Sequence, residues 1–210
     1  MEAVALIDYG SGNLRSAEKA LWEAARRAGK RRDIRVTRDP DFVRRADRVV
    51  LPGVGAFASC KAGLEGVPGL TAAMAEAVRG RGRPFLGICV GMQLLADRGL
   101  EFGETPGLGW IGGEVRRLEP DGDLPVPHMG WNTVEPARPH PLMPEGAGMY
   151  FANSFVFRPA DAGATVATAD HGGRFTAMVA NDNIAGVQFH PEKSQGAGLE
   201  LLARFMGWTP

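Results

Sequence analysis

Cysteine is scarce in this sequence, and long apolar runs are absent from it. The 210 residues include two cysteines, Cys60 and Cys89, which form no CxxC pair and are too few for a disulfide framework. No apolar run approaches the ~20 residues that span a bilayer. The N-terminus lacks the basic region and cleavage site of a signal peptide. We therefore expect a cytoplasmic chain with reduced cysteines and no membrane contact.

An excess of charge is lacking as well. Lys and Arg total 24 and Asp and Glu total 24, so the formal net charge is zero. This balance gives no reason to expect nucleic acid as a partner. Basic residues nevertheless crowd the segment 26–48, where aspartates interrupt them. We interpret this segment as a solvated face, with a functional basic patch as the alternative.

The first half of the chain alternates apolar runs with helical periodicity. Glycine-bounded runs typical of buried strands occupy residues 3–10, 48–55 and 84–89. Apolar residues recur at helical spacing in residues 13–29, 70–80 and 91–97. This alternation predicts an α/β fold, a flavodoxin-like three-layer arrangement in which helices cover both faces of a central, mostly parallel sheet.

The second half has a different character. Residues 101–190 hold short β-like pieces separated by Gly, Pro and Asp, which predicts an antiparallel β-rich addition. The DHGG stretch at 170–173 is typical of a hairpin turn. Residues 198–208 predict a closing helix over the sheet. Because no linker or repeat is evident, we expect one domain over residues 1–210.

A cysteine stands between two glycines in PFLGICVGMQLL (84–95). Gly87, Cys89 and Gly91 form G-x-C-x-G, the cysteine version of the nucleophile elbow. In such a strand-to-helix turn the central residue is strained, and its side chain projects at a helix N-terminus that favours a thiolate. Cys89 is therefore a candidate nucleophile, with a small buried cysteine as the alternative. Cys60 lacks this frame and is interpreted as structural.

A base for this thiol is indicated near the C-terminus. The apolar run 184–189 ends at His190, and Glu192 follows two residues later. Residues i and i+2 share a face in extended chain, and Pro191 keeps His190 extended. The Glu192 carboxylate can then hold the imidazole tautomer, as the third member of a triad does. The alternative is a strand-end histidine beside a surface glutamate. Among the other histidines, His128 is the least easily dismissed.

A glycine turn should reach the same edge of the sheet. In LPGVGAF (51–57) the amide of Val54 is the first candidate for an oxyanion donor, with Gly55 beside it. The amide of Val90 in the elbow is the second donor. The alternative is a plain tight turn. A phosphate loop is rejected because no G-x-x-x-x-G-K-[ST] follows, and we predict neither a cofactor nor a metal site.

Taken together, these motifs resemble those of the class I glutamine amidotransferases. The resemblance is carried by GICVGMQLL (87–95), FHPE (189–192) and PGVG (52–55). It narrows to the glutaminase subunits of imidazole glycerol phosphate synthase through DYGSGNL (8–14), HMGWN (128–132) and YFANSF (150–155). The similarity extends from about residue 4 to residue 206, and the motifs are far more specific as a set than singly.

The resemblance implies a mechanism and a substrate. Cys89 attacks the side-chain amide of L-glutamine, His190 transfers the proton to departing ammonia, and Glu192 orients His190. A γ-glutamyl thioester forms, and water then releases glutamate. The residues that the resemblance places at the glutamine are Gly53, Gln93, Asn153 and Ser154.

The resemblance also implies a partner. The chain would form a heterodimer with a (β/α)8-barrel cyclase, which uses the ammonia to make imidazole glycerol phosphate and aminoimidazole carboxamide ribotide in histidine biosynthesis. The glutaminase would be slow without its partner, and the change to an active oxyanion arrangement would take place in PGVG (52–55). The residues expected to face the partner are Asn13, Arg15, Trp131 and Lys193.

One departure from the family pattern keeps alternatives open. Asn153 stands where the family commonly has histidine, and Phe155 where it has tyrosine. A catalytically silent, regulatory homologue is therefore one alternative. A glutaminase that serves another synthase is a second, although HMGWN and DYGSGNL argue against it. A free-standing cysteine hydrolase such as a peptidase is a third, but it leaves Gln93 unexplained.

Overall fold

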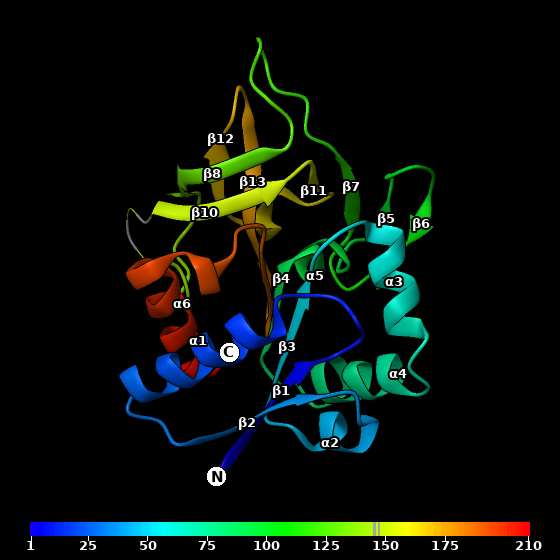
Figure 1. Cartoon of the computed structure of the whole chain (residues 1–210), viewed down its shortest axis with the longest axis vertical. Coiled ribbons are helices and arrows are strands. Elements are labelled where there is room, and N and C mark those ends of the chain that lie inside the picture. Colours follow the sequence, from blue (N-terminus) through cyan, green and yellow to red (C-terminus); the bar gives the residue numbers. More distant parts are fainter. Residues whose placement is uncertain (145, 147) are drawn as a thin grey trace.

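The structure, a computed structural model, describes residues 1–144, 146 and 148–210, and a central sheet runs through it (Figure 1). Within the described residues this sheet has eight strands in the order β2-β1-β3-β4-β14-β13-β12-β9. Their bounds are β1 (Glu2–Ile7), β2 (Arg32–Thr37), β3 (Arg48–Gly53), β4 (Phe85–Cys89), β9 (Glu135–Pro136), β12 (Thr165–Asp170), β13 (Arg174–Asn181) and β14 (Ile184–Val187).

The sheet is parallel on one side and antiparallel on the other. Strands β2, β1, β3, β4 and β14 run parallel to one another, and β13, β12 and β9 follow as antiparallel neighbours. Asp170 pairs with Arg174, so DHGG is a hairpin turn as predicted. Part of the predicted antiparallel addition thus extends the main sheet, while its other strands form two smaller sheets. The predicted α/β fold class is confirmed.

Helices cover both faces of the sheet, as Figure 1 shows. On one side lie α1 (Leu14–Arg27) and α6 (Gln195–Gly207), which pack against each other. On the other side lie α2 (Pro40–Arg45), α3 (Phe57–Glu65), α4 (Leu70–Ala75) and the π-helical turn η1 (Glu76–Gly80). In α1 the buried residues recur at helical spacing, which gives it one apolar face toward the core.

Two smaller sheets stand above the carboxyl ends of β3 and β4 in Figure 1. One pairs β8 (His128–Thr133) with β10 (Gly148–Asn153). The other has the order β11-β7-β5-β6, with bounds β5 (Arg98–Gly99), β6 (Thr105–Pro106), β7 (Gly113–Arg117) and β11 (Phe155–Pro159). Short 3-10 turns occupy η2 (Ala162–Ala164) and η3 (Pro191–Lys193). These sheets cover the edge of the main sheet at which the candidate site residues lie.

The helix predicted over residues 91–97 is much shorter in the structure. Helix α5 spans only Val90–Gln93. The carbonyls that would continue it, those of Leu94, Leu95 and Ala96, instead accept hydrogen bonds from the amides of the loop 108–111. The helical spacing of this stretch was therefore outweighed by pairing with a distant loop, which the local sequence does not encode.

Strand β2 lies inside the basic segment and was not predicted. Arg32 on β2 is buried, its guanidinium 2.9 Å from Glu2 and 2.7 Å from the carbonyl of Met206. Arg48 on β3 is buried as well and donates to the carbonyl of Trp208 at 2.8 Å. These two arginines satisfy carbonyls at the end of α6, where cations are favoured.

No helix in the described part of the chain is both long enough and apolar enough to cross a membrane.

Candidate active site

Cys89 occupies a strained turn between β4 and α5. Its φ of 54° and ψ of −114° lie outside the regions that L-residues ordinarily adopt. A Cβ on Gly91 would overlap the carbonyl oxygen of Leu51, and a Cβ on Gly87 would lie 2.7 Å from the carbonyl carbon of Gly91. Both glycines are therefore required by backbone contacts. The structure has the elbow geometry that the G-x-C-x-G pattern predicts.

His190 and Glu192 lie together at the same edge of the sheet. His190 Nδ1 is 2.8 Å from Glu192 Oε1, and the two side chains are 4% and 3% exposed. The backbone N–H of His190 donates to the carbonyl of Tyr150 on β10, and Ser194 Oγ donates to the carbonyl of His190. These bonds hold the ring with Nδ1 toward the carboxylate, which leaves Nε2 for another partner.

The surroundings of His190 favour its protonated form. Burial of the ring lowers its pKa, but interactions with the Cys89 thiol and the Glu192 carboxylate outweigh this effect. They raise the pKa of His190 from 6.5 to about 10. An imidazolium here stabilises negative charge on the Cys89 sulfur. The arrangement thus places a cationic ring beside the candidate nucleophile.

A cavity of about 350 Å³ opens beside these residues, a size that suits a small metabolite. One carboxylate, that of Glu101, and one ammonium, that of Lys193, are among the groups that line it. Gly53 does not line it, because this glycine packs against the backbone of Gly91 and the hydroxyl of Tyr9. The lining residues are Val54, Gly55, Cys89, Val90, Gln93, Glu101, Pro127, Ala152, Asn153, Ser154, Phe155, His190 and Lys193.

The turn predicted as the oxyanion hole is held by side chains from elsewhere. The Val54 N–H donates to Ser11 Oγ at 3.0 Å, and Ser11 Oγ donates to the Val54 carbonyl at 2.7 Å. Cys60 Sγ lies 3.3 Å from the same carbonyl. The amide of Val54 is therefore already engaged, whereas Val90 begins α5 and lines the cavity. Val54 can serve an oxyanion only after its peptide turns away from Ser11.

Gln93 and Asn153 meet at one backbone carbonyl. Gln93 Nε2 donates to the Phe155 carbonyl at 3.0 Å, and Asn153 Nδ2 donates to it at 3.2 Å. Gln93 Nε2 also donates to Gln188 Oε1 at 3.0 Å. With this nitrogen occupied, Gln93 offers its Oε1 to a ligand. Asn153 Oδ1 is buried without a hydrogen-bond partner among the described residues and lies in a residue that lines the cavity.

The residues predicted to face a partner are exposed. Trp131 is 52% exposed and contacts Tyr150 edge-on, with the ring centroids 6.1 Å apart. Lys193 Nζ lies 5.7 Å from the centre of the same tyrosine ring and also lines the cavity. Asn13 and Arg15 are exposed at the start of α1. Lys193 therefore lies at the cavity, and Trp131 is connected to it through the ring of Tyr150.

His128 proves to be a buried neutral residue rather than a second base. Its ring stacks on Phe151 at 5.0 Å and on His171 at 4.2 Å between centroids. Burial, together with the neighbouring His171, lowers the pKa of His128 to about 4. We assign it to the packing of β8 against β10 and the hairpin turn.

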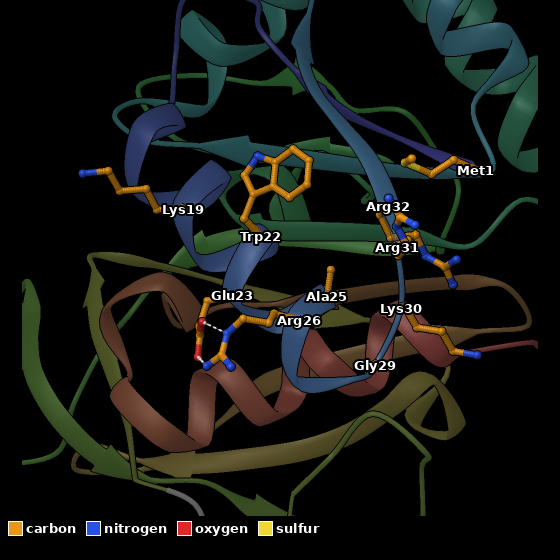
Figure 2. A pocket seen from close by; sticks show the side chains of 10 residues that line it. All are labelled: Met1, Lys19, Trp22, Glu23, Ala25, Arg26, Gly29, Lys30, Arg31 and Arg32. Carbon is orange, nitrogen blue, oxygen red and sulfur yellow. Dashed lines mark hydrogen bonds and ion pairs between the residues drawn. The ribbon is translucent and has the colours of Figure 1, made fainter.

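The basic segment forms a hollow away from the cysteine. Figure 2 shows Trp22 with Lys19, Arg26, Lys30 and Arg31 around it, and the hollow measures about 800 Å³. Arg26 is paired with Glu23 at 2.8 Å. Other arginines of the segment pair with nearby carboxylates in the same way. These pairs agree with a solvated face for those arginines, whereas Arg32 and Arg48 of the same segment are buried, so the interpretation holds for only part of it. The hollow contains none of the candidate catalytic groups.

Three residues near the site were missed from the sequence. Ser11 fixes the Val54 peptide, Glu101 adds a carboxylate to the cavity, and Gln188 Nε2 lies 3.7 Å from Cys89 Sγ. Ser11 lies in the DYGSGNL motif, so its position in that motif was an available signal. Gln188 interrupts an apolar run as its one polar residue, which was also a signal. Nothing local marks Glu101.

The fold resembles those of solved amidotransferases. A crystal structure of a glutamine amidotransferase superposes with a TM-score of 0.71 and 18% identity, covering 98% of this chain and 99% of that one. A glutamine amidotransferase from Thermotoga maritima superposes with a TM-score of 0.57 and 19% identity, covering 91% of this chain and 76% of that one. At such identities the likeness establishes the fold alone.

Sequence comparison goes further. The family described as glutamine amidotransferase class-I matches residues 5–207. The imidazole glycerol phosphate synthase subunit HisH of Caulobacter vibrioides is 65% identical over the whole of both chains. The HisH subunit of Rhodospirillum rubrum is 57% identical over 99% of each. The chain therefore belongs to the class-I glutamine amidotransferases, an enzyme family, and within them to the HisH subunits of imidazole glycerol phosphate synthase.

Proposed function

We propose that this chain hydrolyses L-glutamine to glutamate and ammonia for imidazole glycerol phosphate synthase, in the biosynthesis of histidine. One observation carries the proposal. A cysteine held at φ 54° lies beside a buried histidine–carboxylate pair in a cavity of metabolite size. The identity of 65% and 57% to two HisH subunits, over nearly the whole of each chain, supports a place in histidine biosynthesis. We treat residues 1–210 as one amidotransferase domain, which the family match over 5–207 supports.

The first half of the reaction transfers the glutamyl group to the cysteine. Cys89 Sγ attacks the side-chain carbonyl carbon of glutamine, and the carbonyl oxygen takes up the negative charge. The amide of Val90 stabilises this oxyanion, joined by that of Val54 once its peptide has turned. The C–N bond then breaks, and ammonia leaves with a proton from His190. A γ-glutamyl thioester remains on Cys89.

The second half returns the enzyme to its starting state. His190, now neutral, takes a proton from water, and the oxygen attacks the thioester carbonyl. The C–S bond breaks, glutamate is released, and the sulfur keeps the electron pair. Glu192 holds the ring through Nδ1 at 2.8 Å during both halves, so that Nε2 faces the reacting atoms.

The cavity suits the two charged ends of an amino acid. The Glu101 carboxylate, the free Gln93 Oε1 and the unpartnered Asn153 Oδ1 can accept from an α-ammonium group. Lys193 can pair with an α-carboxylate. At position 153, where the family commonly has a histidine, Asn153 offers a hydrogen-bond acceptor that does not change with pH. Ser154 lines the cavity beside it.

The ammonia is passed to a partner subunit, which we propose to be a (β/α)8-barrel cyclase. Its product pair would be imidazole glycerol phosphate and aminoimidazole carboxamide ribotide. The HisH name of the relatives marks them as subunits of a larger synthase, which supports this heterodimer. Exposed Trp131 and Met129, at 52% and 65%, give β8 an apolar surface near the cavity that suits a protein contact.

Steady-state ammonia release from glutamine tests the proposal. The chain is assayed alone and then with a barrel cyclase and its nucleotide ligand, with Cys89→Ala as the background. We expect slow release alone and much faster release from the complete complex. Absence of release from a folded, bound complex, or release by Cys89→Ala at the wild-type rate, would contradict the proposal.

A further inference from the structure

Gln188 is a buried polar side chain beside the reacting sulfur, and the mechanism above does not use it. It is 0% exposed and follows β14 directly. Its backbone N–H donates to the Ala177 carbonyl at 2.8 Å, which fixes it in the sheet. The chain bends at Gln188 and Phe189, and the side chains of Gln188 and His190 both interact with Cys89.

The Phe155 carbonyl determines, through Gln93, which atom of the Gln188 amide is the nitrogen and which is the oxygen. The Phe155 carbonyl can only accept, so the Gln93 atom 3.0 Å from it must be nitrogen. The same nitrogen lies 3.0 Å from Gln188, whose facing atom must therefore be the oxygen. This leaves the Gln188 nitrogen toward Cys89 Sγ, at 3.7 Å. The donor at the sulfur is thus specified by backbone geometry.

We propose that Gln188 is a positioning residue for the nucleophile. Its amide N–H donates to the Cys89 sulfur, stabilises negative charge there and fixes the side-chain direction of the cysteine. The Phe155 carbonyl sets the direction of this donor through Gln93. The role of this donor in turnover rests on the proposed glutaminase function, whereas its effect on the reactivity of the thiol does not.

The arrangement separates Gln188 from the substrate. Gln188 does not line the cavity, whereas Gln93 does. Loss of the Gln188 donor should therefore lower kcat while KM for glutamine stays near its original value. Loss of Gln93 should change both, because Gln93 faces the substrate and also orients Gln188. This split between kcat and KM distinguishes a positioning role from substrate binding.

Alkylation of Cys89 by iodoacetamide tests the proposal on the full chain. The rate constant at pH 7.5 is followed by mass spectrometry of the peptide that carries Cys89, which excludes Cys60 from the reading. In Gln188→Met, which keeps the length but removes the donor, we expect the rate to fall roughly tenfold, as for a lost hydrogen bond to a charged group. The complete synthase complex then gives kcat and KM for the same variant.

A matched control separates reactivity from stability. Asn183 donates to the carbonyls of Val78 and Arg83 at 2.9 and 2.7 Å, at the opposite end of β4 from Cys89. Asn183→Leu removes two partly buried bonds, and it should lower the melting temperature while Cys89 reacts at the wild-type rate.

The outcomes decide the proposal whether or not one variant folds. A folded Gln188→Met chain that alkylates as fast as wild type would overturn it. If Gln188→Met does not fold, Gln93→Met is tested instead. Without Gln93 the Gln188 amide is free to turn its N–H away from Cys89, so the alkylation rate should fall measurably, but by less than in Gln188→Met. An unchanged rate in Gln93→Met would then overturn the proposal. Since alkylation needs no glutamine, failure of the glutaminase assay leaves this test intact.

Discussion

Replacing Glu192 by glutamine isolates the charge of the buried pair from its geometry. The glutamine side chain is the same size, and its oxygen can still accept from His190 Nδ1, which lies 2.8 Å from Oε1 of the native carboxylate. The tautomer is therefore kept, while the negative charge is lost. A neighbouring opposite charge typically shifts a pKa by roughly 1–3 units. With both side chains almost fully buried, solvent screens the pair little. We expect the pKa of His190 to fall by that amount from about 10.

The same substitution changes how stability depends on pH. The pKa of His190 is raised from 6.5 to about 10 in the folded chain, so the charged ring stabilises the fold fully below about pH 6.5. This contribution is lost as the pH rises through 10. In Glu192→Gln the contribution should be smaller and should be lost completely at a lower pH, because the folded-state pKa lies closer to that of the unfolded chain.

Histidine-selective NMR titration measures the shift directly. The titration of His190 is followed by its ring C–H signals, and urea unfolding between pH 6 and 10 gives the free energy of unfolding. Glu200→Gln is the control, since Glu200 pairs with Arg204 on the exposed side of α6. An unchanged His190 titration in Glu192→Gln would refute the assignment of the raised pKa to this pair.

Three further predictions concern the backbone around the nucleophile and the cavity mouth. Gly91→Ala should fail to fold or should melt far below wild type, because its Cβ overlaps the Leu51 carbonyl; a wild-type melting curve would contradict the elbow packing. Ser11→Ala frees the Val54 peptide and should raise ammonia release by the chain alone several-fold, and a reduced or equal rate would show that Ser11 does not restrain it. Lys193→Ala should weaken stimulation by the cyclase while the melting temperature stays near wild type; titration calorimetry with the cyclase and the stimulated rate check this, and both unchanged would exclude an interface role.

Much of the fold and the triad could be predicted because their signals are local. The elbow needs a glycine on each side of Cys89, and the contacts at Gly87 and Gly91 show why no other residue fits. His190 and Glu192 lie two residues apart, so their 2.8 Å contact is local, but Glu192 makes it from the 3-10 turn η3 and not from the extended chain that the sequence predicted. The alternation of strand and helix likewise depends on short-range periodicity.

What could not be predicted depends on contacts between distant segments. Ser11 and Val54 are 43 residues apart, and nothing in either motif shows that a hydroxyl occupies the amide of the turn. The Gln93–Gln188 contact joins residues 95 apart. Helix α5 was expected to be longer because its spacing is helical, but pairing with the loop 108–111 ends it. Tertiary context decided each of these outcomes.

The position of β14 has a consequence for synthesis of the chain. This strand comes from residues 184–187, yet it lies between β4 and β13 in the middle of the sheet. While the ribosome is still making the last residues, β4 has an unpaired edge, and Cys89 has neither His190 nor Glu192 beside it. A prematurely terminated chain would therefore expose an aggregation-prone strand edge and a thiol without its base. On the proposed mechanism, a chain that stops before residue 190 has no base for the Cys89 thiol and should not hydrolyse glutamine.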